Sequence, residues 1–575
     1  MQLSSSLDTI VARYAWLSTF SHPPDVLPLL STNDPPSFQQ SIQLNASVER
    51  LSAALPGLQN DLDILRRAVA SLEAQMSRLL SLKHECETIL SPIRRLPTEM
   101  LMEILRRTRS TDGRYSDGRR EMDALDFNVF SVESGPWYLG HVCSLWRYTI
   151  ENLCPVLWST MTIEEPLKKG SFSKYQRVVK RNMVALLERV LERTHGYQID
   201  FVFEHHRFMA PLSDNAMVRC FSMMLEHSRQ WRRAELIIPH FLLARISLVQ
   251  GKLDWLEDAY LICSGSPCPV NLDALAVAPN LKFLHLENVH QRAEIRFPTA
   301  NLITLYDGRR FTGHDVTPKY LHYIASSPNL LSFSWHHHSP IPVSSPPYYP
   351  LITHPTLREL STCSGKLLHS LILPALTEMA LRSGHEDAKN GPVECPADAL
   401  SELRNLLVRS QCSLTVLSLV DAGVNDHLFA IITLCPHLRD LSIEFNGWTG
   451  GPGTDPLMAS LIRRMSEMHI VEDMNQHILV PGLESLTIKL ISFDEELIRF
   501  IDRQFVEMIV SRVRSEFPNP SPLKELSLTV TGREWGWKLD ASGLKALKTL
   551  NGYRGFHVTT LLEHKRGNTD YEYSD

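Results

Sequence analysis

The chain has 575 residues, of which 43% are hydrophobic and 21% charged, and its formal net charge is −6. This length predicts about three or four domains of ordinary soluble, globular composition. The net negative charge gives no electrostatic basis for binding nucleic acid or an anionic membrane. The ten cysteines are scattered without a CxxC pair, so neither a zinc site nor a disulfide framework is indicated. We therefore expect a reducing cytoplasmic or nuclear compartment. No signal peptide and no apolar run of the ~18 residues that span a bilayer is found.

The first 41 residues are rich in Ser, Pro and Thr, which predicts a mostly disordered segment with a short helix near Ile10 to Phe20. Residues 42–91 are predicted to form a coiled-coil helix, because apolar residues recur at alternating spacings of three and four. They are Val48, Leu51, Leu55, Leu58, Leu62, Leu65, Val69, Leu72, Met76 and Leu79. Pro56 is expected to interrupt this helix. The seam could form a homodimer with a second copy, fold back on the chain, or pack as a single helix on the next segment.

A short amphipathic helix is predicted to follow. Pro97 suits a first helical position, and Glu99 lies in the first turn, where a carboxylate is favourable. Leu101, Ile104 and Leu105 then form one apolar stripe. A second short helix, with Val142, Leu145, Trp146 and Thr149 on one face, ends before Pro155.

Three motifs in this region, LPxExLxxIL, VCxxW and PxLW, together resemble an F-box of the large fungal group of F-box-like proteins. The resemblance implies a small all-α domain, here residues 92–165, that docks on the Skp adaptor of a cullin–RING ubiquitin ligase. The adaptor-binding residues that it implies are Leu96, Pro97, Glu99, Leu101, Ile104, Leu105, Val142, Cys143, Trp146, Leu157 and Trp158. Residues 106–141 depart from the family pattern as a long insert, whose turn-rich composition predicts a polar surface excursion.

Residues 166–220 are predicted to be a helix–strand connector. The apolar spacing indicates a helix from Ser173 to Thr194, closed by His195 and Gly196, and alternation then indicates a strand from Gln198 to Glu204. The basic outer face of this helix is interpreted as solvated, because few aromatic residues are interleaved with its charges.

A repeated LxxLxL unit occupies most of residues 221–555. Full or nearly full copies start at Leu281, Leu330, Leu376, Leu414, Leu438, Leu483 and Leu523, partial copies at Leu302 and Leu357, and degenerate copies at Trp231 and Leu256. Helices are expected between some copies, at Asp398–Arg409, His427–Leu434 and Glu495–Phe517. A strand and a helix at a period in the twenties is the signature of leucine-rich repeats, so we predict an irregular α/β leucine-rich-repeat solenoid. Residues 556–575 are expected to be a polar tail.

No catalytic motif is found: the chain lacks a GxSxG elbow, an HExxH pair and a phosphate-binding GxxxxGK[ST] loop. His336–His338 has no fitting carboxylate or cysteine for a metal, so we expect no metal or other cofactor and no enzyme activity. The prediction is a substrate-recognition subunit of a ubiquitin ligase, and the alternative is a repeat scaffold without a ligase connection, which the insert favours. Candidate target-binding residues lie between the repeat leucines, at Lys282, His285, Ser332, Arg439, Ser442, Glu484, Thr487, Glu525 and Ser527. The target protein itself is not indicated by the sequence.

Overall fold

The structure is a computed structural model. It describes residues 2–107, 127–165, 174–205, 216–264, 271–290, 293–309, 315–335, 349–383, 395–448, 454–471, 474–492, 496–514, 523–532, 535–537 and 541–564. The chain divides into two compact units, residues 1–100 and 101–575.

The first unit is helical. Its elements are α1 (Gln2–Tyr14), η1 (Ala15–Ser18), η2 (Leu27–Leu30), α2 (Phe38–Leu90) and η3 (Pro92–Arg95). Helix α2 begins at a capping box, in which the Ser37 side chain accepts from the backbone of Gln40 and the Gln40 side chain accepts from the backbone of Ser37. The helix predicted for this part is therefore present, but it starts earlier and continues through Pro56, contrary to the expected break. A proline removes only one backbone hydrogen bond from so long a helix, and the flanking turns keep their own.

The N-terminal stretch differs from the disorder that its composition indicated. Helix α1 folds back on α2, where the Arg13 guanidinium and the Tyr14 hydroxyl each donate to the Asp61 carboxylate at 2.9 Å. The Arg50 guanidinium also lies 4.4 Å from the centre of the Trp16 ring. Composition could not reveal this docking, because the contacts join residues far apart in sequence, by 47 and 48 positions at Asp61.

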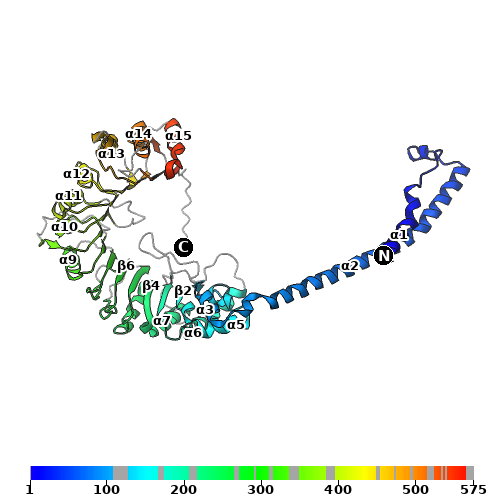
Figure 1. The fold of residues 1–575 in the computed structure, drawn as a ribbon, viewed down its shortest axis with the longest axis horizontal. Coiled ribbons are helices and arrows are strands. Elements are labelled where there is room, and N and C mark those ends of the chain that lie inside the picture. Colours follow the sequence, from blue (N-terminus) through cyan, green and yellow to red (C-terminus); the bar gives the residue numbers. More distant parts are fainter. Residues whose placement is uncertain are drawn as a thin grey trace. The chain divides into compact units, whose positions relative to one another are not determined.

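The second unit is built on one parallel sheet of fifteen described strands, which follow one another across the sheet in chain order. They are β1 (Phe127–Asn128), β2 (Thr160–Glu164), β3 (Ile199–Glu204), β4 (Trp231–Pro239), β5 (Asp258–Ser264), β6 (Phe283–Glu287), β7 (Thr304–Gly308), β8 (Ser332–Trp335), β10 (Glu359–Thr362), β12 (Glu378–Arg382), β13 (Val416–Val420), β14 (Asp440–Trp448), β17 (Ser485–Ser492), β19 (Glu525–Gly532) and β21 (His557–His564). In Figure 1 the strands line the inner side of an arc and the helices form its outer side. This is a solenoid-like α/β architecture.

The helices of this unit precede the sheet or connect its strands. They are α3 (Thr98–Arg107, which begins in the first unit), α4 (Gly135–Leu139), α5 (Ser144–Tyr148), α6 (Lys174–Arg193), α7 (Ala216–Glu226), α8 (His240–Leu243), α9 (Thr317–Ser326), α10 (Gly365–His369), α11 (Ala399–Ser410), α12 (His427–Thr433), α13 (Thr454–Ser466), α14 (Arg503–Val513) and α15 (Ala541–Leu550). Three short strand pairs lie outside the main sheet: β9 (Ile352–Thr353) with β11 (Leu371–Ile372), β15 (Met468–Val471) with β16 (Met474–His477), and β18 (Glu496–Ile498) with β20 (Trp535–Trp537). Shorter turns are η4 (Thr149–Leu153), η5 (Pro155–Leu157), η6 (Ser228–Gln230), η7 (Ala244–Val249) and η8 (Tyr553–Gly555).

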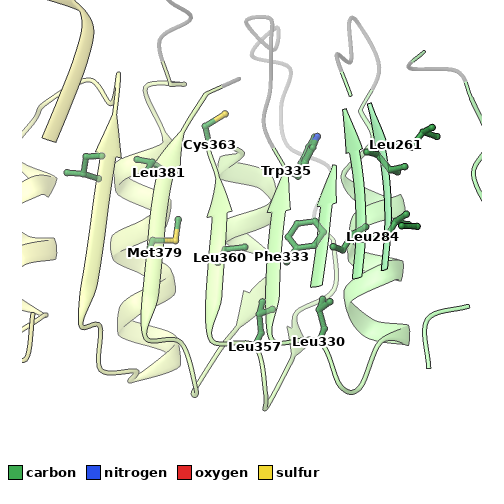
Figure 2. Close-up of a cluster of buried hydrophobic side chains, with 14 of the residues drawn as sticks. Leu261, Leu284, Leu330, Phe333, Trp335, Leu357, Leu360, Cys363, Met379 and Leu381 are labelled. Carbon is green, nitrogen blue, oxygen red and sulfur yellow. The ribbon is translucent and has the colours of Figure 1, made fainter. Parts of the chain in front are cut away.

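The repeat leucines are in register across the sheet. Leu417, Leu441 and Leu486 are paired positions on β13, β14 and β17, and all three are buried. Figure 2 shows such rows on neighbouring strands, with Phe333 beside Leu360. One repeat cannot bury its leucines alone, so stacking of neighbours produces a continuous core. The eleven predicted copies all fall on strands of this sheet.

The sheet is longer than the predicted repeat region. Strands β1 and β2 lie within the segment predicted to be all-α, β3 lies in the predicted connector, and β21 occupies much of the predicted polar tail. These strands were missed as repeat units because they lack the leucine spacing. On β2 and β3 the buried positions carry other apolar residues, such as Met161 and Phe201, which pair in register.

A buried ion pair explains why the copy at Leu302 is only partial. Strand β7 carries Asp307 at the position paired with Leu286, and this carboxylate accepts from Arg309 Nε at 2.8 Å and from the Tyr320 hydroxyl at 2.9 Å. The Arg309 guanidinium also donates to the Ala293 carbonyl at 2.9 Å. The guanidinium lowers the pKa of Asp307 although burial acts in the opposite direction. The pair therefore stays charged inside the core.

Candidate protein-binding surfaces

Four of the predicted adaptor-binding side chains are enclosed by the chain itself. The exposed fractions are 1% for Leu101, 0% for Leu105, 7% for Leu157 and 1% for Trp158. Amphipathic spacing placed Leu101 and Leu105 on one apolar stripe, and the PxLW motif gave Leu157 and Trp158. Neither signal distinguishes a face that meets the protein's own core from a face that meets a partner. Their packing holds the short helices in place, so contact with another protein must come from other side chains.

Trp158 contacts several elements of this core. Its indole Nε1 donates to the Ile150 carbonyl at 2.9 Å, and its ring meets the Trp137 ring edge-on at 4.9 Å between centroids. The Arg193 guanidinium of α6 lies 4.6 Å from the Trp158 ring centre and is paired with Glu151 at 2.6 Å. The PxLW motif thus joins the short helices to the sheet domain.

Other predicted adaptor-binding residues are accessible. Pro97, Glu99, Ile104 and Val142 are exposed, whereas Leu96, Cys143 and Trp146 are half-buried. The exposed fractions of Ile104 and Val142 are 40% and 55%. These residues can meet a partner without any change in the fold.

The structure adds three exposed apolar residues that the motif comparison missed: Tyr138 on α4, and Leu145 and Tyr148 on α5. Together with Ile104 and Val142 we name them the exposed apolar set. Leu145 was placed on an apolar helix face from the sequence alone, so spacing could have identified it, whereas the two tyrosines gave no signal. Large contiguous patches of exposed apolar side chains commonly mark a protein-interaction surface.

Contacts inside the second unit join the elements that carry this set. The Arg147 side chain on α5 donates to the Gly140 carbonyl, just after α4, at 3.1 Å. Burial raises the pKa of the Cys154 thiol, and the positive charge of Arg106 at the end of α3 acts in the opposite direction, so α3 lies near the end of η4. The exposed apolar set is therefore carried by one packed group of helices.

The predicted polar insert is only partly an excursion. Residues 108–126 lie outside the described residues, but Phe127, Val129 and Phe130 are buried and β1 pairs with β2. Gly135 approaches Phe127 closely with a positive φ of 57°, and a Cβ there would lie 2.3 Å from the Phe127 Cβ. Residues 127–130 of the insert therefore belong to the core and the sheet. The sequence did not indicate this, because the turn-rich stretch before them dominated the composition of the insert.

The predicted target-binding residues lie on or just before strands of the large sheet. Within strands, His285, Ser332, Ser442, Thr487, Glu525 and Ser527 alternate with buried apolar residues, so they lie on the sheet face opposite the helices. Lys282, Arg439 and Glu484 directly precede strands. Register brings Ser442, Thr487 and Ser527 into one row with Ser418.

Towards β5, the same row becomes aromatic. The His285 ring stacks on the Tyr306 ring at 4.0 Å between centroids, and Tyr260 follows at 5.7 Å from His285. The His285 Nε2 also lies 3.3 Å from the Glu287 carboxylate. Of these, only His285 was among the predicted residues, although both tyrosines occupy the same repeat position.

A neighbouring row on this face is acidic. Glu359 and Glu378 are paired positions, and Asp440 and Glu525 lie further along the same row. Partial burial raises the pKa of the Glu378 carboxyl, and the Glu359 and Asp440 carboxylates raise it further. Among the other predicted residues, Glu484 accepts from Lys524 at 2.7 Å, and Lys282 pairs with Glu257 at 3.0 Å. This face therefore offers charge and hydroxyl groups rather than apolar surface.

None of the helices in the described ranges is long and apolar enough to cross a membrane. Within those same ranges, no three His, Cys, Asp or Glu side chains come together as a metal site. His336–His338 lies outside the described residues. Burial raises the pKa of the Cys263 thiol to about 12, so this thiol is protonated and unreactive at neutral pH.

Comparison with known proteins identified no relative: no family model and no curated protein sequence matches the chain.

Proposed function

We propose that this chain is the substrate-recognition subunit of an SCF-type ubiquitin ligase, in which an F-box docks on the Skp adaptor and leucine-rich repeats bind a target protein. The observation that carries the proposal is the exposed apolar set on α3–α5. Ile104 and Val142 belong to the F-box-like motifs and remain exposed in the folded chain. Apolar side chains exposed together on packed helices are typical of a surface that a partner protein covers.

In this proposal the chain performs no covalent chemistry. The adaptor and cullin would hold a ubiquitin-charged enzyme, and the sheet domain would hold the target beside it. Proximity of this kind accelerates transfer by raising the local concentration of the target's lysines. The polar face of the sheet, with Ser442, Thr487 and Glu525, supports recognition of a polar or charged surface on the target. Assembly of this complex would take place in the cytoplasm or the nucleus.

The competing proposal is a repeat scaffold without a ligase connection. It is supported by strand β1, which pairs with β2 and ties the insert to the sheet. The two proposals differ in whether the exposed apolar set has the Skp adaptor as its partner.

Co-expression with the cognate Skp adaptor, followed by pull-down, tests the proposal. We expect wild-type protein to retain the adaptor and the Ile104→Asp, Val142→Asp double variant to lose it, because a buried charge opposes an apolar interface. Both residues are exposed, so the variant should fold. Val408→Asp is a matched control, since Val408 on α11 is 54% exposed but far from the motifs in sequence. Retention by the double variant would show that residues other than Ile104 and Val142 bind the adaptor, whereas no retention by folded wild type would favour the scaffold.

A further inference from the structure

The two halves of α2 differ in what covers them. In the first half, α1 packs against one side of the helix, leaving Leu58 half-buried and Asp61 only 8% exposed, although Val48 and Leu55 remain exposed at 58% and 53%. In the second half the apolar residues are open to solvent. The exposed fractions are 54% for Val69, 61% for Leu72, 59% for Met76, 63% for Leu79, 63% for Ile89 and 65% for Leu90.

This mostly uncovered stretch, from the half-buried Leu65 to the exposed Leu90, continues the heptad pattern. With Val69 and Met76 at a positions and Leu72 and Leu79 at d positions, Lys83 occupies the next a position and Cys86 the next d position. The stretch spans roughly 39 Å of helix at 1.5 Å per residue. A seam of this length and period is covered well only by a partner with the same repeat, and α2 itself is such a partner.

We propose that α2 pairs with α2 of a second copy of this chain in an antiparallel coiled coil over residues 65–90. Charge complementarity selects this orientation. In a parallel dimer in register, Lys83 would face Lys83 of the second copy at an a position. The one attractive g–e pair would be Asp61 with Arg66, but Asp61 already accepts from Arg13 and Tyr14 of its own chain.

In the antiparallel arrangement, Met76 packs against Leu79 of the second copy. Lys83 then lies beside Leu72 and Glu73 of the second copy, and Arg66 lies beside Glu87 at facing e positions. Twofold symmetry gives each pair twice. The axis falls between Ser77 and Arg78, which is also the middle of the uncovered stretch, so the overlap ends where α1 begins to cover the helix.

The charges needed for these pairs are available. Lys83 lies 3.7 Å from Glu87 and Arg66 lies 3.5 Å from Asp63 within the helix, and all four side chains are at least 62% exposed. Exposed pairs of this kind contribute little to stability. They therefore exchange for contacts between the chains at small cost. This inference does not depend on adaptor binding.

Sedimentation analysis of the full-length chain tests the dimer. We expect the mass of two chains at tens of micromolar and the mass of one chain for Leu72→Asp, Leu79→Asp, with unchanged helix content by circular dichroism because both residues are exposed. Leu248→Asp on η7 is the matched control, since Leu248 is 63% exposed outside α2, and this variant should remain a dimer. A wild-type chain that is monomeric at these concentrations overturns the proposal.

Disulfide trapping tests the orientation. The exposed Cys86 would face Val69 of the second copy, so Val69→Cys should form a cross-link between positions 69 and 86 under mild oxidation. Wild-type chain should form none through Cys86. A Cys86–Cys86 cross-link in wild type would instead show a parallel dimer and overturn the antiparallel arrangement.

Charge exchange provides an independent readout. Arg66→Glu or Glu87→Arg alone should weaken the dimer about tenfold, since two symmetry-related pairs become repulsive. The double exchange should restore wild-type affinity, because it restores both pairs between the chains while leaving the contacts within each helix unfavourable. No restoration by the double exchange would contradict the proposed register.

Discussion

The short helices α3–α5 and the inner face of the sheet differ in whether they expose apolar side chains to solvent. On β14 and β17, Leu441, Ile443, Leu486 and Ile488 are buried, and the positions beside them carry Ser, Thr and charged residues. On α3–α5 and the turn between α4 and α5, Leu101 and Leu105 are buried, but Ile104, Val142 and Leu145 remain exposed. Both regions belong to the second unit, so the difference is not one of overall composition.

This difference separates two kinds of recognition. An exposed apolar surface gains free energy when a partner removes it from water, so α3–α5 suits a stable docking partner. A polar face gains little from burial and instead selects its partner by matched charge and hydrogen bonds. In the proposed ligase subunit, α3–α5 would bind the adaptor and the polar face of the sheet would select the target protein.

The buried ion pair of β7 provides the largest expected effect on the sheet side. Arg309→Met should lower the free energy of unfolding by about 3–5 kcal/mol, because it leaves the Asp307 carboxylate buried without its cation. Urea denaturation followed by tryptophan fluorescence measures this change. The double variant Asp307→Leu, Arg309→Met should recover most of the loss. A loss below about 1 kcal/mol in the single variant would contradict the packing described for this pair.

On α3, the adjacent residues Leu105 and Ile104 allow the stability effects of a buried and an exposed apolar side chain to be compared. Leu105→Ala should cost about 2–5 kcal/mol of stability, because it leaves a cavity in the core. Ile104→Ala should change stability by less than about 0.5 kcal/mol, because its side chain is largely solvated. Thermal or urea denaturation compares the two variants. Equal losses would show that the burial pattern of α3 is not as described.

His477, on β16 outside the main sheet, should make the stability of the chain depend on pH. Burial, together with the positive charge of Arg512, lowers the pKa of His477 to about 4 from its usual 6.5. As the pH falls from about 6.5 to about 4, the unfolded chain binds a proton that the folded chain excludes, so stability decreases by about 2–3 kcal/mol. Urea midpoints across this range measure the slope. His477→Asn should have a shallower slope, and an equal slope would remove His477 as its cause.

The smallest expected effect concerns the acidic row of the sheet face. The raised pKa of Glu378 means that the folded state disfavours its ionised form, so its ionisation costs stability as the pH rises through the folded pKa. Glu378→Gln should therefore increase stability at pH 7 by no more than about 0.5 kcal/mol, and the gain should vanish in acid. Paired thermal denaturation curves at both pH values measure this difference. A gain that grows in acid would have the wrong sign.

The sequence predicted the repeated strands well, because each LxxLxL copy encodes its own alternation of buried and exposed positions. It missed β1 and β21, which pair with neighbouring strands but lack the leucine spacing of the repeat. It also did not predict the docking of α1 on Asp61, a contact between distant residues. At the candidate docking surface, motif spacing found Ile104 and Val142 but grouped them with Leu101 and Trp158, which only the packed structure separates.

Hydrogen exchange of the chain, with and without the Skp adaptor, tests the central claim most directly. The account predicts that binding slows amide exchange in residues 98–107 and 138–148, where the exposed apolar set lies, and leaves the strands from β13 to β19 unchanged. Slower exchange on those strands instead, or none anywhere with the adaptor in excess, would contradict the assignment of α3–α5 as the docking surface.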